Sequence, residues 1–299
     1  MGYIEIKGKK YEISGKRLIL WEQSLKSIRE IGNLENLENL TILNLDRNNI
    51  ESLDGLENLV NLKILSIENN NIKEIRGLEN LTKLKKLNLE RNEISQIKGL
   101  DNHTNLIELK LGFNDISVIK GLENLKGLKY LSLSSNQISE IYGLRELESL
   151  EHLFLSNNSI SNIRNIENQK KLKILSLGGN KLTRIEKIPK KIGSLRLSMN
   201  EIREITGLKH YLDLKTLFLD HNKLSEIKGL DTLINLSYLN LANNQINELK
   251  GLGNLTKLQQ LYLSGNKINS DLIEKLGGVD RWGCALKPQK FVEYCRKNK

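Results

Sequence analysis

Residues 62–83 read LKILSIENNNIKEIRGLENLTK, and residues 84–105 repeat the pattern as LKKLNLERNEISQIKGLDNHTN. The phrase they share is L-x-x-L-x-L-x-x-N-x-I/L, which occurs eleven times within residues 40–268. Its asparagine recurs every 22 residues, except for one step of 20 residues between Asn180 and Asn200. A fixed period of this length is typical of a solenoid, in which each turn packs only on its neighbours. Function is therefore expected on a surface, because the core of a solenoid is structural.

Each copy of the phrase predicts a short β-strand followed by a polar turn. In the copy quoted first, Leu65 and Ile67 alternate with Ile64 and Ser66, so that one pair points into the core and the other outward. Asn70 follows at the point where the chain leaves the strand. We expect this asparagine to be buried, since its amide can bond backbone groups that would otherwise cost ~1–3 kcal/mol each.

The second half of each turn predicts a tighter backbone. Apolar residues occur at every third position from Ile72 to Leu81, which fits a 3₁₀-like turn better than an α-helix. Gly77 precedes Leu78, and seven other turns carry glycine at the same place, which predicts a backbone conformation that disfavours a Cβ atom. Lys187 replaces this glycine in the shortened repeat, and Asn165 replaces it in the repeat before.

The two ends of the array need caps. The segments YIEI at 3–6 and YEI at 11–13 predict a β-hairpin over the first turn. Asp271 to Glu274 resembles a capping box that opens a short helix, and Pro288 suits the first turn of a second helix. Trp282 is expected to pack over the last repeat. We therefore expect three regions: an N-terminal hairpin cap (1–17), one irregular and eleven regular repeats (18–268), and a C-terminal helical cap (269–299).

These residues resemble the leucine-rich repeat family, in particular its 22-residue class, which is typified by the regulatory subunit of protein phosphatase 1. The resemblance covers residues 18–268. It implies an α/β repeat solenoid, a curved horseshoe with parallel β-strands on the concave side and 3₁₀ segments on the convex side. The class includes phosphatase regulators, spliceosomal and axonemal subunits and bacterial surface adhesins. Its members usually bind macromolecules through the concave side, so the resemblance implies a non-catalytic scaffold or adaptor for a protein partner.

The positions that vary between repeats indicate where such a partner would bind. Phenylalanine occurs within the repeats only at positions expected on the concave side or its rim, and Tyr142 and Tyr211 are the only repeat aromatics outside this side. Aromatic and arginine side chains dominate protein interfaces. A high strand propensity of Tyr and Phe is the alternative explanation. The residues predicted to bind a partner are Phe113, Tyr130, His152, Phe154, Arg196, Met199, Phe218, His221, Tyr238 and Tyr262.

A phosphatase partner is one form of this hypothesis. The resemblance implies concave acids interleaved with aromatics for such a partner, and acids do gather toward the N-terminal half, for example Asp46 and Glu68. Lys110 and Arg196 occupy the corresponding column, which argues against a phosphatase.

An uneven charge supports a second hypothesis, which is binding of nucleic acid or another anionic surface. The formal charge of the chain is +10, and residues 170–215 hold 12 Lys and Arg against 4 Asp and Glu. Phosphates would be attracted to such a patch, although a solvated, lysine-rich convex face is the simpler interpretation. The residues of the predicted basic patch are Lys170, Lys171, Lys173, Arg184, Lys187, Lys190 and Lys191.

Catalysis and cofactor binding are not expected. His152 and His221 would be separated by three repeats, ~14 Å at strand spacing, which is too far for one metal ion or one acid–base pair. Two cysteines do not make a disulfide framework, and we expect Cys284 and Cys295 to be reduced thiols. No apolar run resembles a signal peptide or a membrane span. We therefore expect a cytoplasmic protein, or a nuclear one if the source is eukaryotic, that is a monomer or a weak dimer.

Overall fold

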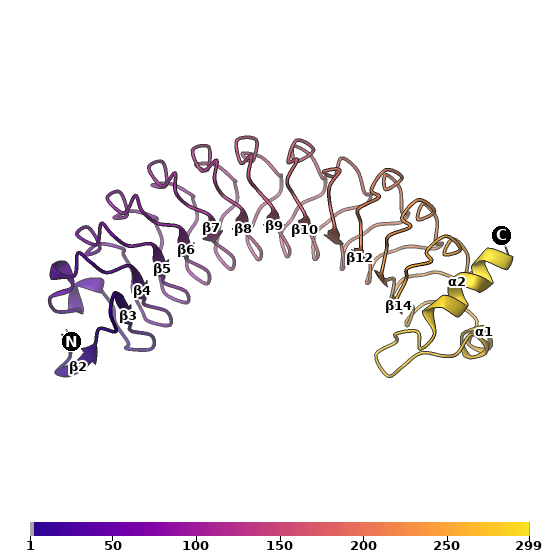
Figure 1. Cartoon of the computed structure of the whole chain (residues 1–299), viewed down its shortest axis with the longest axis horizontal. Helices are drawn as coiled ribbons and strands as arrows, with labels where there is room; N and C mark the ends of the chain where they lie inside the picture. Colours follow the sequence, from indigo (N-terminus) through magenta and orange to yellow (C-terminus); the bar gives the residue numbers. More distant parts are fainter. Residues whose placement is uncertain (1–2, 299) are drawn as a thin grey trace. The chain divides into compact units, whose positions relative to one another are not determined.

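The computed structural model describes residues 3–298. The chain divides into two compact units, one of residues 1–138 and 142–153 and the other of residues 139–141 and 154–299. Both units are built from the same stacked turn, which confirms the predicted repeat solenoid (Figure 1). Residues 1, 2 and 299 of the predicted caps lie outside the described residues.

In the first unit, parallel strands of three residues follow one another in chain order and line the inner side of the curved ribbon (Figure 1). An antiparallel hairpin of β1 (Tyr3–Ile6) and β2 (Lys9–Glu12) precedes them, as predicted. The parallel strands are β3 (Arg17–Ile19), β4 (Ile42–Asn44), β5 (Ile64–Ser66), β6 (Lys86–Asn88), β7 (Glu108–Lys110) and β8 (Tyr130–Ser132).

The second unit continues the pattern with parallel strands and ends in two helices. Strand β9 (His152–Phe154) lies at the division, with Leu153 in the first unit and Phe154 in the second. The other elements are β10 (Ile174–Ser176), β11 (Ser194–Arg196), β12 (Thr216–Phe218), β13 (Tyr238–Asn240), β14 (Gln260–Tyr262), α1 (Ser270–Lys275) and α2 (Pro288–Lys297).

The middle residue of every parallel strand is a buried leucine, so the first and third residues face outward from the inner side. The repeated asparagine closes each turn as predicted. Asn114 donates through Nδ2 to the carbonyl oxygens of Leu89 (2.9 Å) and Leu111 (3.1 Å), and its Oδ1 accepts from the amide of Ile94 at 2.9 Å. One side chain thereby joins two successive turns. It supplies the acceptor for the buried amide of Ile94 and shares the carbonyls of Leu89 and Leu111 with Asn92 and Asn136.

The outer half of each turn is held by hydrogen bonds three residues apart, the bonds of a 3₁₀ turn. The amide of Leu81 donates to the carbonyl of Leu78 at 2.8 Å. Among residues 3–298, regular 3₁₀ helices form only in the irregular first repeat, as η1 (Ile28–Glu30) and η2 (Leu34–Asn36). Gly99 has a φ of +78°, and a Cβ atom there would overlap the carbonyl oxygen of Ile75. This overlap explains the glycine that precedes the leucine of most turns.

The caps follow the predictions in part. Helix α2 begins with Pro288, and it buries Phe291, Val292 and Cys295. The predicted capping box of α1 is wrong, because the helix begins at Ser270 and its cap is Asn269, whose side chain accepts from two backbone amides of the first turn. The predicted packing of Trp282 over the last repeat is also wrong. Its side chain is 70% exposed and lies beside the guanidinium of Arg281.

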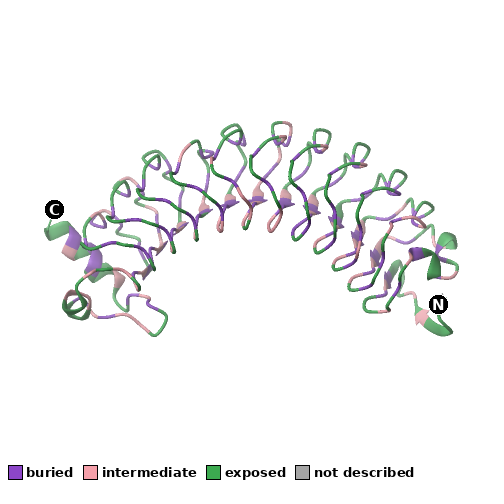
Figure 2. Ribbon diagram, turned by 180° about the vertical axis from the view of Figure 1, so that it is seen from behind, coloured by how far each residue is buried: buried purple, intermediate pink, exposed green. Residues whose placement is uncertain are grey.

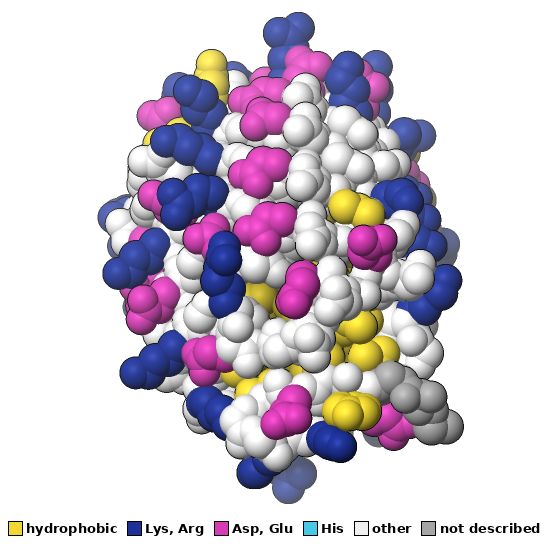
Figure 3. All heavy atoms as spheres, turned by 90° about the vertical axis from the view of Figure 1, so that its left-hand side faces the viewer, with side chains coloured by type: hydrophobic (Ala, Val, Ile, Leu, Met, Phe, Trp, Pro, Cys, Tyr) yellow, Lys and Arg dark blue, Asp and Glu magenta, His cyan; other side chains and the backbone are white. Residues whose placement is uncertain are grey.

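Burial divides each unit into a core within the turns and a solvated outside. The buried residues line the interior of the turns, and the exposed ones lie mostly on the loops (Figure 2). On the face seen in Figure 3, Lys and Arg lie along both edges, with Asp and Glu between them. Mixed charges of this kind are typical of a solvated surface.

Candidate functional site

The inner side of the first unit carries a few aromatic residues embedded among charged ones. Tyr130 on β8 and His152 on β9 meet edge to face, with ring centroids 6.0 Å apart. Phe113 lies at the rim with a φ of +54°, and the guanidinium of Arg91 lies 4.2 Å from its ring centroid. Three predicted site residues therefore belong to this unit, and only Tyr130 and His152 touch each other.

Charged side chains next to Tyr130 form ion pairs with one another. Glu108 forms ion pairs with Lys86 at 2.8 Å and with Lys110 at 3.5 Å. Burial opposes ionisation of Glu108, but these two ammonium groups lower the pKa of the carboxyl overall. Burial raises the pKa of Tyr130 above its ordinary value. Lys110 thus has an acidic partner within the unit, but it shares this carboxylate with Lys86.

The second unit holds a continuous row of aromatic side chains on its inner side. The rings of Phe218 and Tyr238 lie 4.5 Å apart, and those of Tyr238 and Tyr262 lie 5.5 Å apart. The guanidinium of Arg196 lies 5.2 Å from the Phe218 ring. We call these four residues the aromatic row; they come from the four consecutive strands β11 to β14.

Strand register explains why the row is continuous. Phe218, Asn240 and Tyr262 lie side by side as the third residues of their strands, while Tyr238 is the first residue of β13. The side-chain carbonyl of Asn240 accepts from the amide of Ala242, so this short side chain folds along its own strand. The Tyr238 ring is in contact with the rings of both Phe218 and Tyr262. Each such aromatic contact contributes ~0.5–1.5 kcal/mol.

Burial also changes the acidity of the two tyrosines. Burial, followed by the neighbouring Tyr262 hydroxyl, raises the pKa of Tyr238 to about 12. The pKa of Tyr262 is raised by burial and by the adjacent Cys284. Both hydroxyls therefore stay protonated at neutral pH, so the row offers neutral rings and hydroxyls together with one cation.

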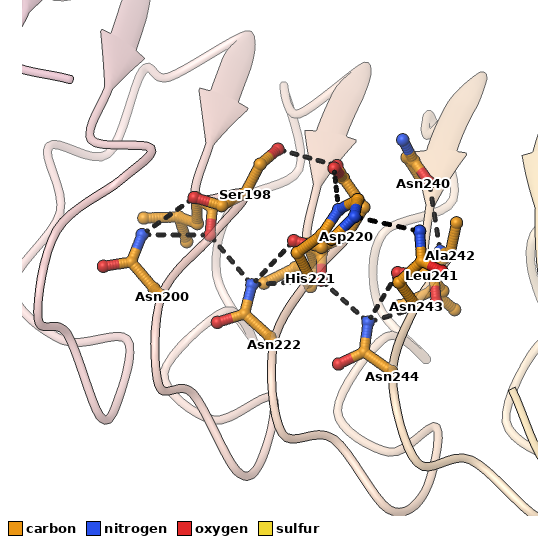
Figure 4. Close-up of polar contacts among 12 residues, drawn as sticks. Ser198, Asn200, Asp220, His221, Asn222, Asn240, Leu241, Ala242, Asn243 and Asn244 are labelled. Atoms are coloured by element: carbon orange, nitrogen blue, oxygen red, sulfur yellow. Dashed lines mark hydrogen bonds and ion pairs between the residues drawn. The ribbon is translucent and has the colours of Figure 1, made fainter. Parts of the chain in front are cut away.

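Met199 and His221 occupy the rim next to this row, each with a φ of +55°. His221 is held by two contacts, with Nδ1 3.1 Å from a carboxylate oxygen of Asp220 and Nε2 3.1 Å from the amide nitrogen of Asn243 (Figure 4). An amide nitrogen can only donate, so Nε2 accepts and Nδ1 carries the proton. Ser198 donates to the other carboxylate oxygen of Asp220 at 2.6 Å.

This serine, aspartate and histidine do not form a nucleophilic triad. A triad requires the histidine to take the proton of the serine hydroxyl. Here Asp220 lies between Ser198 and His221 and accepts from both. Within residues 3–298, no group of three or more His, Cys, Asp or Glu side chains could hold a metal ion.

The predicted basic patch lies outside the strands. Arg184 is paired with Glu186 at 3.4 Å. All seven residues of the patch are exposed, and among the described residues five of them form no ion pair. These five are Lys170, Lys171, Lys187, Lys190 and Lys191.

Two neighbours of the aromatic row were not predicted from the sequence. The backbone of Cys284 pairs with that of Tyr262 in an isolated antiparallel β-bridge, and the amide of Ala285 donates to the carbonyl of Leu261 at 2.7 Å. The C-terminal loop therefore extends the inner side beyond β14. Asp220 organises Ser198 and His221. Asp220 could have been found, because it is the only acid at its repeat position in the second unit. The C-terminal loop lies outside the 22-residue repeats, so no repeat position indicates that Cys284 lies beside the row.

Of the ten residues predicted to bind a partner, the structure brings four together in the aromatic row. Met199 and His221 flank the row at the rim, and Phe154 is half-buried on β9 in the same unit. The remaining three are Phe113, Tyr130 and His152, which belong to the first unit. None of the helices described in residues 3–298 is long and apolar enough to cross a membrane.

Comparisons with known proteins agree with the fold. No curated protein matches the chain in sequence. An internalin (inlF) from Listeria monocytogenes is similar over 82% of this chain and 86% of its own, with 27% identity and a TM-score of 0.61. A second internalin from that organism, internalin C2, matches over 69% and 83% with 30% identity and a TM-score of 0.54. A leucine-rich repeat protein of Leptospira interrogans matches over 87% and 93% with 26% identity and a TM-score of 0.59.

The family described as "Leucine Rich repeats (2 copies)" matches four segments that together make up more than half of the chain, namely 60–102, 104–146, 148–190 and 234–276. These segments contain the same leucines and asparagines that build the stacked turns. Proteins of this fold are generally non-catalytic scaffolds that bind other proteins. The chain belongs to the leucine-rich repeat family.

Proposed function

We propose that this protein is a non-catalytic scaffold or adaptor that holds a protein partner on the inner side of its second unit. The observation that carries the proposal is the aromatic row, Arg196, Phe218, Tyr238 and Tyr262. The core does not need these side chains, because the buried leucine of each strand already fills it. The three rings are half-buried and Arg196 is exposed. Accessible aromatic and arginine side chains gathered in one place are typical of binding hot spots.

The proposal is tested by capturing partners from a lysate of the source organism. A variant with Phe218→Ala, Tyr238→Ala and Tyr262→Ala should lose at least ten-fold of a partner that the wild type retains. The matched control is Leu212→Ala with Ile234→Ala, because these two exposed side chains (54% and 50%) lie off the strands of the same unit. Both variants should give the circular dichroism spectrum of the wild type.

Equal capture by the wild type and the triple variant would refute the proposal. A triple variant that unfolds would show that the row is structural, which would also contradict it. Regulation of a phosphatase is a narrower form of the proposal, and it requires the captured protein to be a phosphatase catalytic subunit. A location inside the cell and a monomeric or weakly dimeric state stay predictions from the sequence.

Binding of an anionic surface is a second candidate function, favoured by the five unpaired lysines of the basic patch. Lysines without acidic partners can bind phosphates and release counterions, so such binding weakens steeply with salt. Retention on immobilised single-stranded DNA at low salt should fall when Lys170, Lys171, Lys190 and Lys191 are replaced by Gln. No retention of the wild type would contradict this function and would leave the first proposal untouched.

A further inference from the structure

Arg196 is a positive charge without an acidic partner. It is the exposed third residue of β11, and among residues 3–298 its only side-chain interaction is with the ring of Phe218. The acid of the next turn, Asp220, is already engaged by Ser198 and His221. A guanidinium that lies against an aromatic ring keeps its N–H donors in its own plane, where they can form two parallel bonds to a carboxylate. Contact with the ring also limits the positions that the guanidinium can take.

The surroundings of Arg196 differ on its two sides. Toward β10 the register neighbour is Ser176, which is small and buried, and Gly178 and Gly179 follow it in that turn. At these three positions that turn therefore carries no side chain larger than serine. Toward β12 the register neighbour is Phe218, where the aromatic rings begin. The surface thus offers one cation at the end of an apolar row.

We propose that the aromatic row binds an extended segment of the partner in which one carboxylate is followed or preceded by apolar side chains. The carboxylate pairs with Arg196, and the apolar side chains rest on Phe218, Tyr238 and Tyr262. Strands lie ~4.8 Å apart, so β11 to β14 span roughly 14 Å, the length of about four residues of extended chain. The carboxylate and the apolar contacts therefore fall within four to five consecutive residues. This inference rests on the proposed function of the row.

The first test selects binding sequences without knowing the partner. A random heptapeptide library displayed on phage is enriched on the wild type, on Arg196→Glu and on the triple alanine variant of the row. The wild type should enrich peptides with Asp or Glu within four residues of aromatic or aliphatic residues. Arg196→Glu should enrich Lys or Arg in place of the acid. The matched control Arg203→Gln removes an exposed charge from the same repeat off the strands and should select like the wild type.

The second test measures one enriched peptide by fluorescence anisotropy. Replacing its acid by Gln should weaken binding to the wild type at least ten-fold, and to Arg196→Gln less than two-fold. Comparing a C-terminal amide with a free C-terminus distinguishes a side-chain carboxylate from a terminal one.

The outcomes separate this inference from the proposed function. No enrichment of any peptide, or enrichment without an acid, would overturn the inference, as would an unchanged preference of Arg196→Glu. If the captured protein partner is still lost with the triple variant, the proposed function survives that result. If the triple variant enriches the same peptides as the wild type, the inference fails, because the peptides then do not bind to the aromatic row.

Discussion

Replacing His103 by Leu is expected to stabilise the protein. His103 is fully buried at a position that leucine fills in most turns, for example Leu81 and Leu125. Its Nε2 lies 3.1 Å from the carbonyl oxygen of Leu78, so this nitrogen donates and Nδ1 carries no proton. Nδ1 is buried and has no hydrogen-bond partner.

The magnitude follows from these contacts. The unsatisfied buried acceptor of His103 destabilises the folded state by ~1–3 kcal/mol, and leucine removes it. Leucine also loses one hydrogen bond, whose net contribution to stability is ~0.5–1.5 kcal/mol. Leu78 keeps a partner, since its carbonyl also accepts from the amide of Leu81. We therefore expect His103→Leu to raise the local free energy of unfolding by about 1 kcal/mol at pH 7.5.

The difference in local stability between the His103→Leu variant and the wild type should increase at acidic pH. Burial lowers the pKa of His103 below its ordinary value of 6.5. The unfolded chain then binds more protons than the folded one, so stability is retained above the unfolded pKa and falls as the pH drops below it. At pH 5.5, one unit below that pKa, the wild type should lose up to ~1.4 kcal/mol that the leucine variant keeps.

Hydrogen exchange read by mass spectrometry in peptides covering residues 78–106 measures this local stability at pH 7.5 and 5.5, after correction for the intrinsic exchange rate. Local readout matters because a long repeat array can unfold in parts. His210→Leu is the control, since His210 is exposed and should change neither value. A His103→Leu variant with no gain at pH 7.5, or with the same loss in acid as the wild type, would refute the reasoning.

Two further substitutions test the backbone of the turns by the same exchange measurement. Gly99→Ala should destabilise its turn by about 3 kcal/mol or more, because the residue needs a positive φ and its Cβ meets Ile75, whereas Gly15→Ala, with a φ of +64° but open space, should cost only ~1 kcal/mol. An equal loss in both would contradict the close approach. Asn114→Ala should cost about 3 kcal/mol, since the buried amide of Ile94 loses its acceptor and the hydrogen bonds to the carbonyls of Leu89 and Leu111 are also lost. Asn124→Ala removes one exposed hydrogen bond and should cost less than ~1 kcal/mol. A small effect at Asn114 would mean that water replaces the amide.

The sequence by itself determined the backbone of this protein. The period of 22 residues predicts identical turns, and identical turns can bury their leucines only by stacking. It also predicts the roles of Asn114 and Gly99. The asparagine recurs in every turn and the glycine in most turns, which indicates that the backbone itself requires them. The inward and outward sides of each strand follow from the alternation of its residues.

Only the tertiary structure decided which outward side chains touch. Tyr238 is the first residue of its strand and Phe218 the third residue of its own, yet their rings lie 4.5 Å apart. Trp282 was predicted to pack over the last repeat, but it is exposed. Its loop lies outside the repeats, so the repeat pattern does not specify where the side chain lies. Repetition specifies main-chain geometry, whereas contacts between non-repeating side chains depend on rotamers and on the size of each neighbour across the strands.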